Sequence, residues 1–252
     1  MKNGFTLAEG ATHVGTGKGS RAFTLAEVLI TLGVIGVVSA LTMPTLIKHY
    51  QQHETVNRLK ETYSILYNAV RMSETENGLL ETWDIPDSLW EGASDCYGKG
   101  KIFFEQYLKS YIKIAKDCTA SECWVKNHTR PNGASVHFGN FKTYNIVLAN
   151  GTVIAIFPRG TIVEFYTDLN GKKGPNKYGR DFFDIIISKA SRNDRFGNFN
   201  KSGVYMFGQG KIKTELTSSG YGCSKTATTS AGAYCGALIL HDGWKIDKDY
   251  PW

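Results

Sequence analysis

The first clear pattern in the chain is an unbroken apolar run. Residues 28–47 read VLITLGVIGVVSALTMPTLI, 20 residues without a charged side chain. A helix that rises ~1.5 Å per residue would extend ~30 Å over this run, about the thickness of a bilayer's hydrocarbon core. Helices buried in a soluble core rarely run this long without a charged or amide side chain. The pattern therefore predicts a transmembrane helix over residues 23–47.

An amphipathic pattern follows, over residues 48–78. Its apolar side chains recur at steps of three and four: Val56, Leu59, Tyr63, Leu66, Tyr67 and Val70. This spacing predicts that the helix continues with one face turned to a soluble domain. Asn77-Gly78 is a plausible stop. Pro44 removes a backbone donor inside the helix, so we expect a bend there.

Residues 79–252 have the pattern of a mixed soluble domain. The segment KIFFEQYLKSYIKIAK at 101–116 predicts a second helix, whose inward positions are Phe104, Leu108, Tyr111 and Ile112. Two β-rich runs, 144–149 and 152–157, flank Asn150-Gly151, which is a strong hairpin signal.

Further strands are predicted after this hairpin, and Asp242-Gly243 marks another tight turn. The runs are 161–167, 182–188 (a strand or a short helix), 203–207, 236–240 and 244–246. The predicted fold class is α+β, with a long bent N-terminal helix packed on an antiparallel β-sheet.

The composition fits this picture. Hydrophobic residues make up 42% and charged residues 21%, which excludes an extended disordered chain. Five cysteines are too few for a small fold held mainly by disulfides. The net charge of +6 allows contact with nucleic acid or anionic lipid but requires neither.

Charges near the N-terminus predict its orientation. The segment before the apolar block has three basic residues, Lys2, Lys18 and Arg21, and one acidic residue, Glu9. This excess of positive charge predicts that the N-terminal end stays in the cytoplasm. Glu27 lies inside the block, where a lone carboxylate costs ~3 kcal/mol or more. Either it reaches the interface, or it meets a cation such as the amino terminus of a neighbouring subunit.

These residues carry a family resemblance. Ala22-Phe23-Thr-Leu-Ala-Glu27, followed by VLITLGVIGVVSALTMP, resembles the leader and N-terminal helix of type IV prepilins and type II secretion pseudopilins. The resemblance implies that a prepilin peptidase removes residues 1–22 by cutting between Ala22 and Phe23, and then N-methylates Phe23. It also implies that Glu27 pairs with the new N-terminus of an adjacent subunit, and that Pro44 bends the helix.

The chain departs from the family pattern in two ways. The family usually has Gly before the cut, where this chain has Ala22. An earlier copy of the motif, GFTLAE at residues 4–9, has that Gly. A cut there would leave GATHVGTGKGS after the glutamate, which is too polar to enter a bilayer. We therefore interpret the second copy as the working site.

The resemblance implies a function without catalysis. The expected product is a structural subunit of a type IV pilus or secretion pseudopilus, held in the bacterial inner membrane by one span with residues 79–252 in the periplasm. From there it would enter the filament or reach the cell surface. The implied partners are the prepilin peptidase, other pilin-like subunits, the inner-membrane assembly platform and membrane lipid. Two alternatives stay open: a DNA-uptake pilin, and a membrane-anchored binding or enzymatic domain that never polymerises.

The loop at residues 168–181 is the most conspicuous candidate site. It opens like an EF-hand, but Lys172 takes a ligand position and no closing Glu follows, which excludes that motif. Because major pseudopilins bind calcium beside the sheet, the resemblance implies a looser Ca²⁺ site. Its ligands would be Asp168, Asn170 and Asp181, with Asp184 nearby. The favoured interpretation is a hydrogen-bonded turn without a metal or other cofactor.

The cysteines all follow the apolar segment, and so would face an oxidising compartment. By resemblance to the C-terminal loop of many pilins, Cys223 and Cys235 are the favoured disulfide. Cys118 with Cys123, or either of them with Cys96, is the second. A zinc site of Cys118, Cys123 and two histidines, His128 and His137, is a weaker alternative with irregular spacing.

The sequence has no arrangement typical of an enzyme: it lacks HExxH, GxSxG and a Cys-His pair with a plausible third member. Basic residues crowd positions 172–195, and a nucleic-acid-binding role would use such a patch: Lys172, Lys173, Lys177, Arg180, Arg192 and Arg195. A solvated loop is the favoured interpretation.

Overall fold

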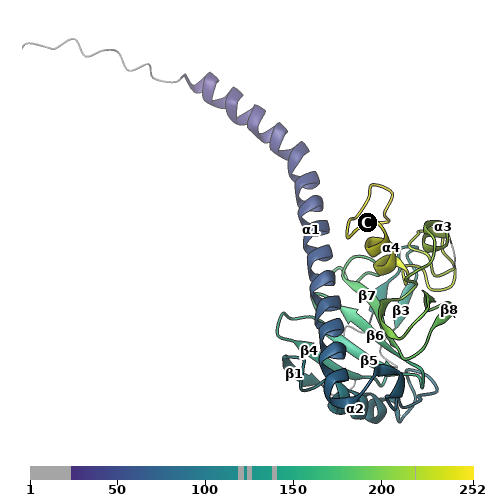
Figure 1. Cartoon of the computed structure of the whole chain (residues 1–252). Coiled ribbons are helices and arrows are strands. Elements are labelled where there is room, and N and C mark those ends of the chain that lie inside the picture. Colours follow the sequence, from purple (N-terminus) through teal and green to yellow (C-terminus); the bar gives the residue numbers. More distant parts are fainter. Residues whose placement is uncertain (1–23, 119–121, 124–126, 138–140, 219) are drawn as a thin grey trace, which may run out of the picture. The chain divides into compact units, whose positions relative to one another are not determined.

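A computed structural model describes residues 24–118, 122–123, 127–137, 141–218 and 220–252 (Figure 1). The chain divides into two compact units, Met1–Ile47 and Lys48–Trp252, and each is considered by itself. The division falls where the apolar run of the sequence ends. The predicted leader and the cleavage position at Ala22 and Phe23 lie outside the described residues.

Helix α1 (Leu25–Asn77) is continuous through Pro44. In its second half the buried residues recur at helical spacing: Val56, Leu59, Thr62, Leu66, Ala69, Val70 and Ser73. The predicted amphipathic face is therefore confirmed, although Tyr67 is 44% exposed. The helix stops at the predicted place, because Gly78 adopts a φ of +80° that a side chain would disfavour. A bend at Pro44 stays a prediction.

In the described residues, six antiparallel strands form the central sheet. Their order is β1-β4-β5-β6-β7-β10. The strands are β1 (Ile114–Cys118), β4 (Tyr144–Leu148), β5 (Val153–Pro158), β6 (Ile162–Asp168), β7 (Phe182–Ser188) and β10 (Gly203–Met206). The predicted hairpin is confirmed: β4 pairs with β5, and Gly151 between them has a φ of +87°. With α1, this sheet gives the predicted α+β class.

Helix α2 (Cys96–Tyr107) lies earlier in the chain than the predicted helix at 101–116. The end of that stretch is instead β1, which pairs with β4 at the edge of the sheet. The inward positions are nevertheless correct for Phe104, Leu108 and Ile112, which are all buried. A one-turn 3-10 helix, η1 (Leu80–Thr82), follows α1.

The C-terminal strand predictions are wrong. Residues 236–240 belong to helix α4 (Cys235–His241), and residues 244–246 are irregular. Five apolar residues cannot distinguish a strand from a short buried helix. The helix packs closely against the sheet at Gly236. A Cβ added there would lie 3.0 Å from the sulfur of Met206.

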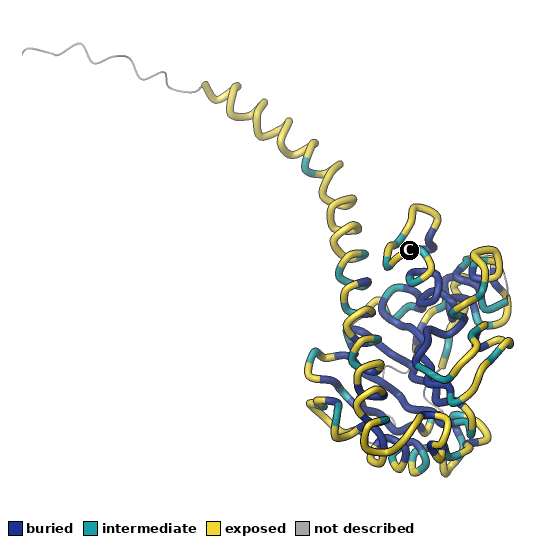
Figure 2. The backbone as a smooth tube through the Cα atoms, viewed as in Figure 1, coloured by how far each residue is buried: buried dark blue, intermediate teal, exposed yellow. Residues whose placement is uncertain are grey.

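Smaller elements complete the fold. They are the hairpins β2 (Asn127–Thr129)–β3 (Ser135–His137) and β8 (Arg192–Asp194)–β9 (Gly197–Phe199), and helix α3 (Lys213–Ser218). The main core packs the second half of α1 with α2 and α4 against the sheet (Figure 2). A second apolar cluster, which includes Phe157, Tyr166 and Phe182, lies on strand positions that alternate with those of the main core.

Candidate functional site

The first candidate is the start of α1, where Glu27 is held by a local bond network. The Thr24 backbone N–H donates to Glu27 Oε2 at 2.9 Å, and the Glu27 N–H donates to Thr24 Oγ1 at 3.2 Å. This reciprocal pair is a capping box, which satisfies N–H groups that a helix start leaves unpaired. The Thr-x-x-Glu spacing before an apolar run is its sequence signature, and sequence reasoning missed it.

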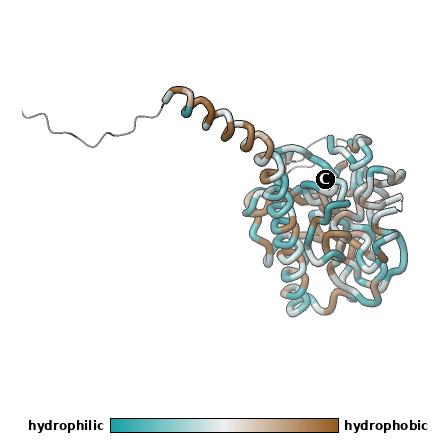
Figure 3. The backbone as a smooth tube through the Cα atoms, turned by 90° about the horizontal axis from the view of Figure 1, so that it is seen from above, coloured by the Kyte–Doolittle hydropathy of each residue, from teal (hydrophilic) through white to brown (hydrophobic). Residues whose placement is uncertain are grey.

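The segment after Glu27 is apolar (Figure 3), and nearly all of it is exposed (Figure 2). Large side chains such as Leu29, Ile35 and Leu41 are between 60% and 74% exposed. By length and composition this helix is suited to cross a membrane, a test that signal sequences also pass. So large an exposed apolar surface is unusual for a soluble monomer.

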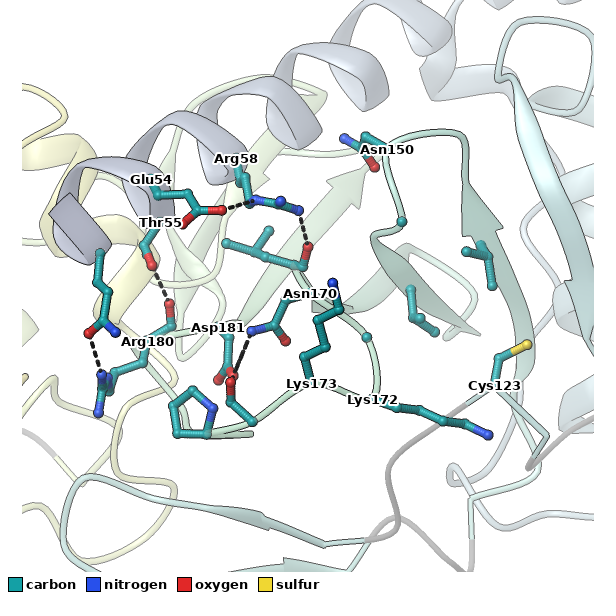
Figure 4. A pocket seen from close by; sticks show the side chains of 18 of the residues that line it. Glu54, Thr55, Arg58, Cys123, Asn150, Asn170, Lys172, Lys173, Arg180 and Asp181 are labelled. Carbon is teal, nitrogen blue, oxygen red and sulfur yellow. Dashed lines mark hydrogen bonds and ion pairs between the residues drawn. The ribbon is translucent and has the colours of Figure 1, made fainter. Parts of the chain in front are cut away.

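The second candidate is a cavity of about 780 Å³ beside the 168–181 loop (Figure 4). Helix α1 forms one wall of this cavity, and two of its side chains donate hydrogen bonds to the loop. Thr55 Oγ1 donates to the Arg180 carbonyl oxygen at 2.8 Å, and Arg58 Nη1 donates to that of Leu169 at 3.1 Å. Lys172 and Lys173 also line the cavity, so its rim is rich in positive charge.

The carboxylates proposed for calcium have partners within the protein. Asp181 accepts the backbone N–H groups of Asn176 at 2.7 Å and Lys177 at 2.6 Å. Asp168 Oδ2 lies 3.0 Å from His128 Nε2, and both side chains are almost completely buried. Burial raises the pKa of Asp168 and that of Asp181.

These contacts fit the hydrogen-bonded turn. Asn170 lies beside Asp181 in the same loop (Figure 4), and its backbone N–H donates to Asp168 Oδ1 at 3.2 Å. Among the described residues, no three His, Cys, Asp or Glu side chains are grouped to hold a metal ion. Asp184, considered as a fourth ligand, lines a different cavity.

Cys223 and Cys235 form the favoured disulfide, and Cys118 is bonded to Cys123, which was one of the pairings left open for the second. The zinc alternative is wrong, because the sulfurs of Cys118 and Cys123 are bonded to each other and are not available as thiolate ligands. Cys96 is the buried free thiol, and burial raises its pKa to about 11.

The third candidate is a cavity of about 210 Å³, which was not predicted from the sequence. Strand β6 places Glu164 and Tyr166 on one face of the sheet, and β7 places Asp184 opposite Tyr166. Arg159 Nη1 lies 2.9 Å from Glu164 Oε2, and the Tyr166 hydroxyl donates to Glu91 Oε1 at 2.8 Å. The sequence predicted a strand at 161–167. It did not predict which loops cover the face of the sheet that carries Glu164 and Tyr166.

The basic residues of 172–195 divide between these places. Lys172, Lys173 and Arg180 line the loop cavity, whereas Arg195 lines the cavity beside Asp184. Arg192 Nη1 is paired with Asp194 at 2.8 Å. The predicted patch is thus not gathered around one cavity.

Comparison with protein families matches residues 45–252 to a family of unknown function (DUF6613). The chain belongs to this DUF6613 family. The match covers the second compact unit and leaves out nearly all of the apolar segment. No curated protein and no solved structure matched the chain.

Proposed function

We propose that this DUF6613 protein is a pilin-like structural subunit, processed after Ala22 and assembled into a type IV pilus or secretion pseudopilus. The observation that carries the proposal is the exposed apolar segment of α1, residues 25–47, whose single carboxylate, Glu27, lies in the first turn. The resemblance of residues 22–44 to prepilins supports it, and so do the sheet packed against α1 and the disulfide near the C-terminus.

In this proposal Glu27 has two successive partners. Before assembly its carboxylate is held by Thr24 at the start of α1. During assembly it pairs with the positively charged N-terminus of Phe23 in an adjacent subunit. The attraction between two opposite charges strengthens as the dielectric constant falls. This contact would therefore favour the alignment of neighbouring subunits that places the N-terminus of Phe23 beside Glu27.

Two substitutions separate the charge from the helix cap. Glu27→Gln removes the charge but keeps a capping-box side chain, since Gln serves at this position as Glu does. Thr24→Ala removes the Thr side chain from the cap and keeps the charge. We expect both proteins to reach the membrane fraction, and we expect Glu27→Gln to lose most of the sheared filament or pseudopilus fraction while Thr24→Ala retains it. Normal assembly of Glu27→Gln would show that pairing through Glu27 is wrong.

A second candidate function is a membrane-anchored binding domain that does not polymerise. The observation that favours it is the polar cavity beside Asp184, which lies within the family-matched region. A binding domain of this kind would keep its apolar helix as an anchor and would form no filament fraction. The assembly assay above therefore also distinguishes the two functions.

A further inference from the structure

The cavity beside Asp184 is enclosed by segments that are distant in sequence. Strands β6 and β7 supply Glu164, Tyr166 and Asp184, and the disulfide loop between Cys223 and Cys235 supplies Ser230 and Ala233. Arg130, which follows β2, closes another side. Asn132, in the β2–β3 turn, donates to the Ala227 carbonyl oxygen at 2.8 Å, so that this turn and the disulfide loop are held together.

Two atoms of opposite hydrogen-bonding character have no partner here. Asp184 is 5% exposed, and its Oδ1 is sealed from solvent without a hydrogen bond among the described residues. The same holds for Nη1 of Arg130. Buried polar atoms are nearly always paired, and leaving one unpaired costs stability. Both residues line the same cavity, so an acidic and a basic side chain that each lack a hydrogen bond lie in its walls, which points to a bound molecule that supplies partners there.

The charges around the cavity define the ligand further. Glu91, Glu164 and Asp184 contribute three carboxyl groups, and the three guanidinium groups come from Arg130, Arg159 and Arg195. When all six groups are ionised their formal charges cancel, so a ligand with a large net charge of either sign would be disfavoured. A molecule with separate cationic and anionic groups would match, with its cation toward Asp184 and its anion toward Arg130.

Size and shape limit the ligand as well. A cavity of about 150 Å³ accepts benzene, so about 210 Å³ has room for a slightly larger molecule. The Arg130 guanidinium lies 5.2 Å from the centre of the Tyr178 ring, a cation–π contact that orients it. Tyr166, Tyr178 and Phe207 add aromatic walls suited to a small side chain.

We propose that this cavity binds a small amine–carboxylate zwitterion, such as a free amino acid. Its ammonium group donates to Asp184, and its carboxylate accepts from Arg130. The site goes beyond the structural function proposed above, because filament assembly needs no ligand here.

Burial and the neighbouring acids Glu164 and Glu91 raise the pKa of Asp184 well above its usual value, against the effect of Arg130. In the empty site this raised pKa favours the protonated form of the Asp184 carboxyl group. When the ligand's ammonium group arrives, that proton passes to the buffer. Binding then releases a proton, and it weakens as the pH falls.

Calorimetric titration of the full chain in detergent micelles tests the proposal. The probes are the twenty common amino acids, each alone, followed by the methyl ester and the N-acetyl derivative of the tightest binder. We expect at least one amino acid to bind, and both derivatives to bind about tenfold more weakly or worse, since each lacks one charge. Repeating the titration in buffers of different ionisation enthalpy should reveal the released proton.

Asp184→Asn and Arg130→Gln should each weaken binding by about tenfold to a hundredfold, whereas the exposed-site controls Asp249→Asn and Arg71→Gln should not. Retained secondary structure and a cooperative melt would show that each variant is folded. If no amino acid binds, the cavity holds water alone and the proposal is wrong. Equal binding of the methyl ester, or unchanged binding by Asp184→Asn, would also overturn it.

Discussion

At the scale of single residues, three acidic side chains differ in burial and in hydrogen bonding. Glu27 is exposed in the described helix and accepts bonds from Thr24. Asp181 is buried but satisfied by two backbone N–H groups. Asp184 is buried with one oxygen unpaired, so among these three it is the carboxyl group for which ionisation is most costly.

The raised pKa of Asp184 predicts a pH-dependent stability. The unfolded chain loses this proton near pH 4, whereas the folded chain keeps it, so the stability that it contributes is complete below that pH and is lost as the pH rises through the folded-state pKa. Asn at this position does not titrate. We expect the stability of Asp184→Asn relative to the wild type to increase with pH, by up to about 1.4 kcal/mol per pH unit.

Urea unfolding of both proteins in detergent at pH 5, 6 and 7 measures this difference. The groups that face Asp184 are Glu164, Glu91 and Arg130, with Tyr166 and Tyr178, and they are unchanged between the two proteins. Asp249→Asn, on the exposed surface, is the matched control. A difference that stays constant over this range would contradict the account of Asp184.

Sequence reasoning identified the loop acids but not their partners. Asp168, Asn170 and Asp181 do lie in one loop, as the Asx- and Gly-rich pattern indicated. The partner of Asp168 is His128, 40 positions earlier in the chain. His128 lies in β2, a strand of a hairpin that was not predicted. Contacts between segments so far apart depend on how the loops fold over the sheet, which local patterns do not specify.

At the scale of elements, α2 shows how a helix is fitted to the sheet. Gly100 is buried at the contact, where an added Cβ would lie 2.8 Å from the Ile156 carbonyl oxygen and 3.1 Å from Tyr144 Cβ. Gly98, half a turn earlier on the same helix, is exposed and has nothing within 4 Å. The two glycines therefore differ in packing while sharing one element.

This pair allows a controlled test of the helix–sheet contact. Gly98→Ala should stabilise the protein by about 0.5–1 kcal/mol, because alanine loses less backbone freedom in a helix. Gly100→Ala should destabilise it by about 1–3 kcal/mol, because the methyl group pushes α2 away from β4 and β5. Thermal or urea unfolding measures both, and equal effects of the two substitutions would contradict the described packing.

Local patterns predicted the elements that have strong signals. The 144–157 hairpin and the end of α1 at Asn77 follow from Asn-Gly pairs and regular spacing. The wrong predictions concern short segments whose pattern is compatible with either a helix or a strand. Residues 114–116 end the predicted second helix but belong to β1, which pairs with β4, and residues 236–240 form a helix where a strand was predicted.

At the scale of the whole molecule, three independent boundaries nearly coincide. The uncharged run ends at Ile47, the second compact unit begins at Lys48, and the DUF6613 match begins at residue 45. The family region thus contains the sheet, the disulfides and both of the cavities described above. The apolar segment, which carries the resemblance to prepilins, lies almost wholly outside it.

Processing at the N-terminus is the central claim of the proposed function, because pairing through Glu27 requires a new amino group at Phe23. Mass spectrometry of the protein isolated from cells that make it measures this directly. The account predicts a mature chain that begins with N-methylated Phe23. A chain that begins at Met1 or at Phe5, or one that is cut beyond Ile47, would contradict it.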